Sequence, residues 1–132
     1  LMIVDKKYIS SKIIICAYDR SEYSNRALKL SAYIAKTLNL PVNVITIDDD
    51  TDNGKITLNE AKNYLDPYSI NVSYVQEKGD VESILVQKTH DPHEPSLLIM
   101  GCYGHSRIRE AILGSTTVQL MRKANKPIIL TK

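Results

Sequence analysis

Three of the five glycines in this 132-residue chain lie in one short stretch, 96–116, together with two hydroxyl-bearing residues. The residues of interest are, in order, Gly101, Gly104, Gly114, Ser115 and Thr116. Backbone N–H groups of a glycine-bounded loop, followed by hydroxyls at a helix start, can hold phosphate. The alternative is that the glycines only turn the chain and relax the entry into the helix. The spacing fits neither Gly-x-x-x-x-Gly-Lys-Ser/Thr nor Gly-x-Gly-x-x-Gly.

Five apolar runs predict the strands that would position this stretch. The run 13–17 is apolar without alternation, as in a strand covered on both faces, whereas 70–74 alternates as at a sheet edge. The predicted strands are 13–17, 42–47, 70–74, 97–100 and 128–130. A helix is predicted after each of the first four strands. The start signals are Ser21 or Ser24, a Thr57–Glu60 capping box, Gly79-Asp80 and a Thr116–Gln119 capping box.

The alternation of strands and helices predicts an α/β fold: a doubly wound, five-stranded parallel sheet with helices on both faces, Rossmann-like. The buried first and fourth strands and the edge-like third suit the strand order 3-2-1-4-5. The winding direction then reverses between strands 1 and 4, which opens a crevice at their carboxyl ends. Tyr18-Asp19 and the segment from Gly101 to Gly104 meet there. Topology and glycine spacing therefore predict a ligand site at one place.

Length and composition predict a single domain over residues 1–132, with 43% apolar and 24% charged residues. The net charge of +2 argues against a nucleic-acid partner. No apolar run approaches the ~18 residues of a membrane span. The two cysteines, Cys16 and Cys102, make no disulfide scaffold. Together with the absence of a signal-peptide pattern, these features predict a cytoplasmic protein.

Two groups of residues invite a metal interpretation. The acidic segment 48–54 does not have the oxygen spacing of a Ca²⁺ loop, and it is expected to be a solvated loop. His90 and His93 have no cysteine or third histidine nearby, so surface positions are expected. The sequence therefore predicts no protein metal site.

From Lys12 to Thr131 the sequence resembles the universal stress protein family. The resemblance rests on 13–19 with Ser21, on Gly79-Asp80, on Gly101-x2-Gly104-x9-Gly114-Ser115 and on Ala124-x-x-Pro127. The glycine spacing is the pattern of the family's ATP-binding branch. The resemblance implies a universal-stress-protein-like domain that binds ATP, with Mg²⁺ or Mn²⁺ through the phosphates, and has a regulatory or stress-response role.

The resemblance also implies a set of site residues. Near the nucleoside it implies Ala17, Tyr18, Asp19, Ile47, Met100 and Gly101, and near the phosphates Gly104, Gly114, Ser115 and Thr116, with His105 and Arg107 in reach. Ser115 and Thr116 have a competing role as helix caps, and His105 and Arg107 have one as exposed side chains. Two residues depart from the family pattern: Arg20 stands where many members have glycine, and Tyr18 is bulkier than usual.

The sequence leaves two other functions open: a nucleotide-free stress-response dimer that acts through protein partners, and a slow ATP hydrolase. The intact glycine pattern speaks against the first. No nucleophile–base pair is evident and Asp19 has no obvious partner in sequence, so the chain is expected to bind nucleotide with at most weak ATPase activity.

The last strand predicts a homodimer. An apolar edge strand offers unpaired N–H and C=O groups to another chain, and a two-fold partner would pair the same strand antiparallel. The predicted interface is Pro127, Ile128, Ile129, Leu130 and Thr131. The resemblance implies the same dimer. The alternative is that the segment from Leu1 to Ile9 folds back over this edge.

Overall fold

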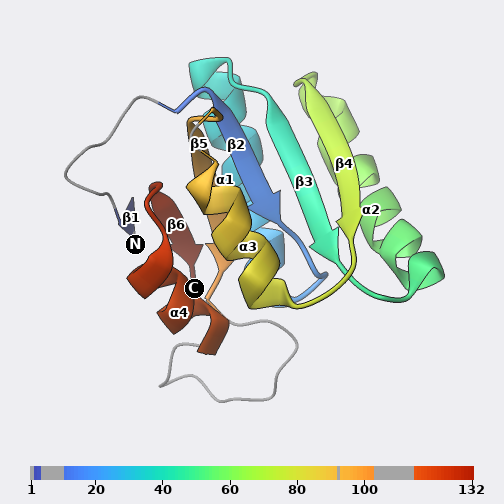
Figure 1. Ribbon diagram of the computed structural model, residues 1–132. Helices are drawn as coiled ribbons and strands as arrows, with labels where there is room; N and C mark the ends of the chain where they lie inside the picture. Colours follow the sequence, from blue (N-terminus) through green and yellow to red (C-terminus); the bar gives the residue numbers. More distant parts are fainter. Residues whose placement is uncertain (1, 4–10, 92, 103–114) are drawn as a thin grey trace.

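The computed structural model describes residues 2–3, 11–91, 93–102 and 115–132 (Figure 1). The strands are β1 (Met2–Ile3), β2 (Ile13–Ala17), β3 (Val42–Ile47), β4 (Val72–Glu77), β5 (Ser96–Gly101) and β6 (Ile128–Thr131). The helices are α1 (Glu22–Leu38), α2 (Thr51–Leu65), α3 (Val81–His90) and α4 (Ser115–Lys123), with a 3-10 turn η1 (Asp66–Tyr68) after α2.

The strands form one sheet in the order β1-β6-β5-β2-β3-β4. β2 to β6 run parallel to one another, which confirms the predicted strand order 3-2-1-4-5. The sheet has one strand more than predicted, β1, which pairs antiparallel with β6 through Met2↔Ile129 and Ile3↔Ile128. The alternative fold-back of the first residues is therefore present at these two positions, and β6 is not the outermost strand.

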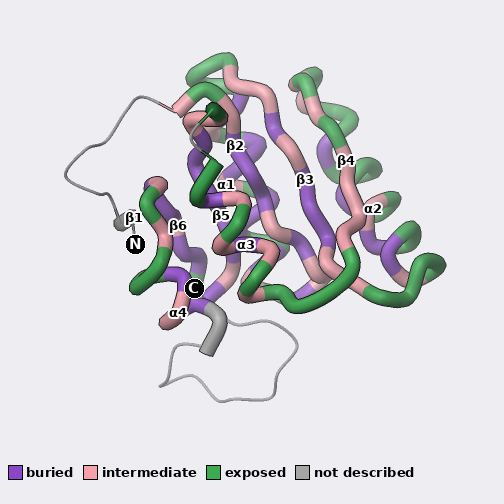
Figure 2. The backbone as a smooth tube through the Cα atoms, viewed as in Figure 1, coloured by how far each residue is buried: buried purple, intermediate pink, exposed green. Residues whose placement is uncertain are grey.

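Each face of the sheet has its own hydrophobic core. α1 and α2 cover one face and α3 and α4 cover the other (Figure 1). The two-residue period of a strand divides the side chains between them. On β2, for example, Ile14 and Cys16 lie in the cluster with α1 and α2, whereas Ile15 and Ala17 lie in the cluster with α3 and α4. Figure 2 shows purple, buried chain along β2 and β5 and mostly intermediate burial along β4, the predicted edge.

Local signals set the ends of α1 as predicted. The Ser21 side chain accepts a hydrogen bond from the Ser24 N–H at 3.2 Å, so Ser21 rather than Ser24 is the N-cap. Asn39 ends the helix in the left-handed conformation at φ 53°. Asp66 and Pro67 end α2, as predicted, and they begin the 3-10 turn η1.

The predicted start of α2 is wrong. The helix begins at Thr51, inside the segment expected to be an acidic loop, because the Asp50 carboxylate accepts hydrogen bonds from the N–H groups of Asp52 and Asn53 at 2.9 and 3.1 Å. Thr57, the predicted cap, is a buried interior residue whose hydroxyl donates to the Asn53 carbonyl at 2.9 Å. An aspartate N-cap satisfies orphan N–H groups earlier in the chain than the capping box would.

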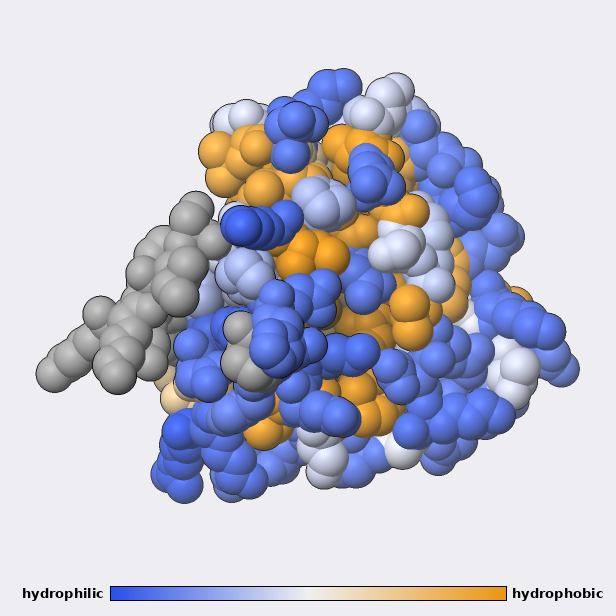
Figure 3. Space-filling model, turned by 45° about the horizontal axis from the view of Figure 1, so that its top comes forward, coloured by the Kyte–Doolittle hydropathy of each residue, from blue (hydrophilic) through white to orange (hydrophobic). Residues whose placement is uncertain are grey.

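One further boundary differs from the prediction, because the strand predicted at 70–74 is observed at Val72–Glu77. Val81 of α3 and Met121 of α4 are 41% and 37% exposed, whereas Leu85 and Leu120 of the same helices are 1% and 0% exposed. No helix within the described ranges has the length and apolar character needed to cross a membrane. On the face in Figure 3, polar residues surround separate apolar patches.

Candidate functional site

The candidate site is built at the carboxyl ends of β2 and β5, which are neighbours in the sheet. From β2 the chain turns through Tyr18–Ser21 into α1 on one face, and α4 covers the other face (Figure 1). The winding direction of the chain therefore reverses between β2 and β5, and open α/β sheets bind ligands at the strand ends where such a reversal occurs. Tyr18 and Asp19 therefore follow a strand that is the direct neighbour of the strand ending at Gly101, as predicted, whereas Tyr103 and Gly104 lie outside the described residues.

Asp19 is held by the turn that leads into α1. One of its carboxylate oxygens accepts a hydrogen bond from the Ser21 N–H at 3.0 Å, and its own N–H donates to Ser24 Oγ at 3.3 Å. Ser24 Oγ in turn donates to the Ser21 carbonyl at 3.0 Å. These contacts fix the backbone and the carboxylate of Asp19 immediately beyond β2.

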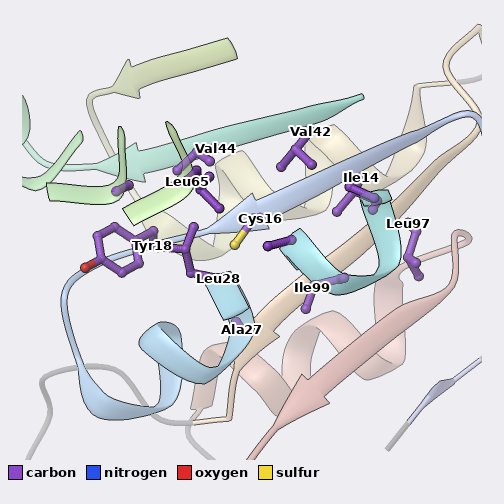
Figure 4. Packing of buried hydrophobic residues seen from close by; sticks show 13 residues of the cluster. Ile14, Cys16, Tyr18, Ala27, Leu28, Val42, Val44, Leu65, Leu97 and Ile99 are labelled. Atoms are coloured by element: carbon purple, nitrogen blue, oxygen red, sulfur yellow. The ribbon is translucent and has the colours of Figure 1, made fainter. Parts of the chain in front are cut away.

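The predicted nucleoside-side residues separate onto two faces. Ala17, Ile47 and Met100 share the face covered by α3 and α4, and the first two are only partly buried. Tyr18 lies on the opposite face, 3% exposed, in the cluster with α1 and α2, and Figure 4 shows its ring beside Leu28. Its hydroxyl donates to Asn25 Oδ1 at 2.9 Å, and burial raises its pKa to about 12. The strand period places Tyr18 opposite its neighbour Ala17, so its side chain is part of the core.

Gly101 is required by helix packing at the end of β5. A Cβ at this position would lie 2.7 Å from Tyr23 Cβ and 2.9 Å from the Ser24 nitrogen, closer than real Cβ contacts. The close approach expected at this glycine is therefore made by the first turn of α1. Because both flanking neighbours are backbone or near-backbone atoms, a larger residue here would displace the turn that holds Asp19.

Two buried threonines join the end of β5 to the helices. The Thr117 hydroxyl donates to the Cys102 carbonyl at 2.8 Å, and the Cys102 N–H donates to the Thr131 carbonyl at 2.9 Å. The Thr131 hydroxyl donates to the Tyr23 carbonyl at 2.7 Å. Cys102 is 5% exposed, and burial raises the pKa of its thiol. Thr131 was predicted only as part of the dimer interface, and Thr117 was given no predicted role, although Thr117 is three residues before the buried Leu120 and so lies on the same helix face.

A second group of polar residues lies between the ends of β2 and β3. Arg20 has φ 67°, in the left-handed region, which accounts for glycine being common at this position in the family it resembles. Its guanidinium donates to Asn53 Oδ1 at 2.7 Å, and the Asn53 amide donates to the Asp48 carboxylate. Hydrogen bonds from the Asp50 N–H and from Asn53 lower the pKa of Asp48. These contacts connect residues far apart in sequence, so spacing gave no signal for them.

Gln76 of β4 holds the turn between β3 and α2. Its side-chain amide donates to the Asp48 and Asp50 carbonyls at 2.9 and 3.0 Å. It occupies the space beside Gly54, where a Cβ would lie 2.1 Å from Gln76 Cδ. The Asp49 carboxylate also accepts a hydrogen bond from the Gly79 N–H at 2.9 Å. The turn that follows Ile47 is thus fixed from the neighbouring strand.

The phosphate-side predictions are only partly covered by the structure. α4 begins at Ser115, so Thr116 lies inside the helix and is not the N-cap that the predicted Thr116–Gln119 capping box requires. The side chains of Ser115 and Thr116 lie outside what the structure describes. Gly104, His105, Arg107 and Gly114 also lie outside the described residues. Within the described ranges, no three histidine, cysteine, aspartate or glutamate residues form a group that could hold a metal ion.

A surface pocket of about 470 Å³ lies at the other end of the sheet. It is formed where α1 ends and β3 begins, next to the chain that follows η1, and its lining includes Asn39 and Ser69. Both of these residues have left-handed backbone conformations. None of the predicted site residues lines this pocket.

Comparison with known proteins agrees with the fold and extends over nearly the whole chain. A family model described as the universal stress protein family matches residues 10–132. A curated relative, universal stress protein Slr1230 of Synechocystis sp., is 27% identical over 130 residues, which are 97% of this chain but 45% of the relative. The chain thus spans less than half the length of that protein.

Solved structures have the same fold at low sequence identity. The universal stress protein from Archaeoglobus fulgidus in complex with dAMP has a TM-score of 0.72 and 21% identity, with 94% of this chain and 99% of that chain covered. A family protein from Arabidopsis thaliana with AMP bound has a TM-score of 0.69 and 11% identity, with 92% of this chain and 91% of that chain covered. Given the family-model match over residues 10–132, the chain belongs to the universal stress protein family.

Proposed function

We propose that this chain binds an adenine nucleotide, ATP, at the carboxyl ends of β2, β3 and β5, and that it has a regulatory role in a stress response. The observation that carries the proposal is that three partly buried or buried apolar residues, Ala17, Ile47 and Met100, share one face at the ends of β2, β3 and β5, and that Asp19 is held immediately beyond β2, at the switch point of the sheet. An apolar surface beside a fixed carboxylate suits a nucleoside, which has a flat base and ribose hydroxyls.

The phosphate side of the proposal rests on α4. The first N–H groups of a helix have no intrahelical acceptor and favour anions, and α4 begins at Ser115, directly after Gly114. We propose that Gly104, Gly114, Ser115 and Thr116 hold the phosphates, with Mg²⁺ or Mn²⁺ bound through phosphate oxygens. The dAMP and AMP complexes of the relatives support an adenine nucleotide as the ligand class.

Calorimetric titration with ATP, AMP and adenosine tests the function, with GTP as the control for base recognition. Mass spectrometry of ligand released from the freshly purified, denatured protein tests whether a nucleotide is carried. Saturable binding of adenine nucleotides with GTP at least about tenfold weaker supports the proposal. Absence of both binding and released nucleotide contradicts it and favours the nucleotide-free alternative.

We also propose that the chain forms a homodimer through residues 127–131 and acts in the cytoplasm. In the dimer, β6 of a second copy would take the antiparallel place that β1 has beside Ile128 and Ile129. Replacement of β1 by β6 of a second copy is favourable in principle, because β1 offers only two residues for pairing whereas a second β6 offers four. The two buried free cysteines, Cys16 and Cys102, suit a reducing compartment.

A further inference from the structure

We propose that Thr117 is a positioning residue for nucleotide binding: its hydroxyl fixes the amino end of α4 against the end of β5. The proposal rests on the proposed function, because it concerns the helix end assigned to the phosphates. The contact itself is well defined. Thr117 is 1% exposed, and its Oγ1 donates to the Cys102 carbonyl at 2.8 Å across 15 residues of sequence. The hydrogen bond therefore joins the first turn of α4 directly to the end of β5.

The position of Thr117 in the helix explains why it would act on ligand binding. It is the third residue of α4, so its hydrogen bond holds the first turn, and the first N–H groups of a helix have no intrahelical acceptor and can bind an anion. Leu120, one turn later and fully buried, anchors the helix by apolar contact. Apolar contact sets no unique register, whereas a hydrogen bond has a fixed direction and length. Thr117 therefore determines where the first turn lies along the sheet end.

The acceptor is itself part of a connected path. The Cys102 N–H donates to the Thr131 carbonyl at 2.9 Å, and the Thr131 hydroxyl donates to the Tyr23 carbonyl at 2.7 Å. Tyr23 is in the first turn of α1, next to Ser24, which holds Asp19. One series of hydrogen bonds thus joins the phosphate-side helix to the nucleoside-side turn. If α4 were displaced, the protein would lose its contacts with the phosphates, whereas the turn that holds Asp19 would stay in place.

The chain provides a matched control for this threonine. Thr89 of α3 is also 1% exposed, and its hydroxyl also donates to a backbone carbonyl, that of Val86, at 2.8 Å. That hydrogen bond stays within one helix and lies near the carboxyl end of α3. Thr89→Val therefore removes the same kind of buried hydrogen bond without freeing α4.

The experiment measures the affinities of the 132-residue chain for ATP and for adenosine. The ratio of the two reports the contribution of the phosphates alone. Thr117→Val is expected to weaken ATP binding about tenfold, while adenosine binding stays within about twofold of the unmodified protein. Thr117→Ser, which keeps the hydroxyl, is expected to retain the original ratio, and Thr89→Val is expected to retain it although its melting temperature falls.

The outcomes separate the inference from the function on which it rests. If the unmodified protein binds no adenine nucleotide, both are overturned. If it binds ATP and Thr117→Val keeps the ATP-to-adenosine ratio, or weakens both ligands equally, the positioning role is overturned and the function stands. Should Thr117→Val fail to fold, Thr117→Ser decides, because loss of the phosphate contribution with the hydroxyl present would also overturn the proposal.

Discussion

Arg20 and Asn53, 33 residues apart in sequence, are joined by a 2.7 Å hydrogen bond between the guanidinium and the amide oxygen. The contact ties the turn after β2 to the first turn of α2. It occurs together with a left-handed backbone at Arg20, φ 67°. A residue with a Cβ costs about 1–2 kcal/mol in that conformation, and the hydrogen bond to Asn53 offsets part of this cost.

Arg20→Ala and Arg20→Gly are therefore expected to differ in stability. Alanine keeps the left-handed strain and loses the hydrogen bond, so it should lower the free energy of unfolding by about 1 kcal/mol. Glycine loses the same hydrogen bond but relieves the strain, so it should be about 1 kcal/mol more stable than the alanine variant. Urea denaturation of the three proteins measures this, and equal stabilities of the two variants would contradict the strain at Arg20.

Gly54 and Gln76 are expected to be energetically coupled. A Cβ at Gly54 would push aside the Gln76 amide, which donates to the Asp48 and Asp50 carbonyls. Gly54→Ala should therefore destabilise the protein by about 1 kcal/mol, since the lost hydrogen bonds outweigh the better helix propensity of alanine.

The effect of Gly54→Ala on the free energy of unfolding should change sign when the Gln76 side chain is absent. In a Gln76→Ala background the space is empty, so Gly54→Ala should stabilise by up to about 1 kcal/mol. A double-mutant cycle from denaturation curves gives the coupling energy. Additive effects of the two substitutions would show that Gln76 does not fill the space beside Gly54.

Gly114→Val is expected to weaken ATP binding far more than it weakens folding. In the proposed site a side chain directly before α4 would occupy phosphate space, and about a tenfold or greater loss of affinity follows. Calorimetric titration alongside thermal melts separates the two effects. A folded variant with unchanged ATP affinity would rule out the phosphate assignment.

Binding without efficient turnover is expected. The sequence shows no nucleophile–base pair that would activate a water molecule for attack on a phosphate. Phosphate release under single-turnover conditions with Mg²⁺ should be far slower than the ~1–10³ s⁻¹ of ordinary enzymes. A rate within that range would reveal a catalytic group among residues to which we assign none.

Ile3→Pro is expected to favour the proposed dimer. Proline lacks an N–H and is disfavoured in a paired strand, so the substitution is expected to weaken the two-residue β1–β6 pairing and free the β6 edge for a second copy. Light scattering at micromolar concentration should show a dimer for the original protein and an equal or tighter dimer for the variant. Monomers in both cases would contradict an interface at residues 127–131.

Local signals account for the parts of the fold that the sequence predicted. Ser21 and Asn39 determine the ends of α1 through their own backbone contacts, and the apolar run of β2 indicates its central place. The start of α2 was missed because two local signals compete, Asp50 and Thr57, and the earlier one prevails. The two-residue β1 has no pattern of its own, since its pairing depends on the exposed edge of β6.

The site was predictable where it depends on topology and not where it depends on side-chain packing. Strand order placed Asp19 and Gly101 at one end of the sheet. Tyr18 has the same parity as Ile14 and Cys16, so alternation alone could have assigned it to the α1 face. The roles of Gln76 and Thr117 depend on distant backbone carbonyls, and no spacing rule identifies such acceptors.

The hydrogen bond from Thr131 to the Tyr23 carbonyl also bears on how the chain is made. It spans 108 residues, and at about 5–20 residues per second the ribosome needs roughly 5–22 s to supply them. The central strand β2 likewise lacks its β5 neighbour until Ser96 has been synthesised. The amino-terminal half therefore waits with an open apolar strand edge during translation, and it is in this interval that nascent chains of this protein most need a chaperone.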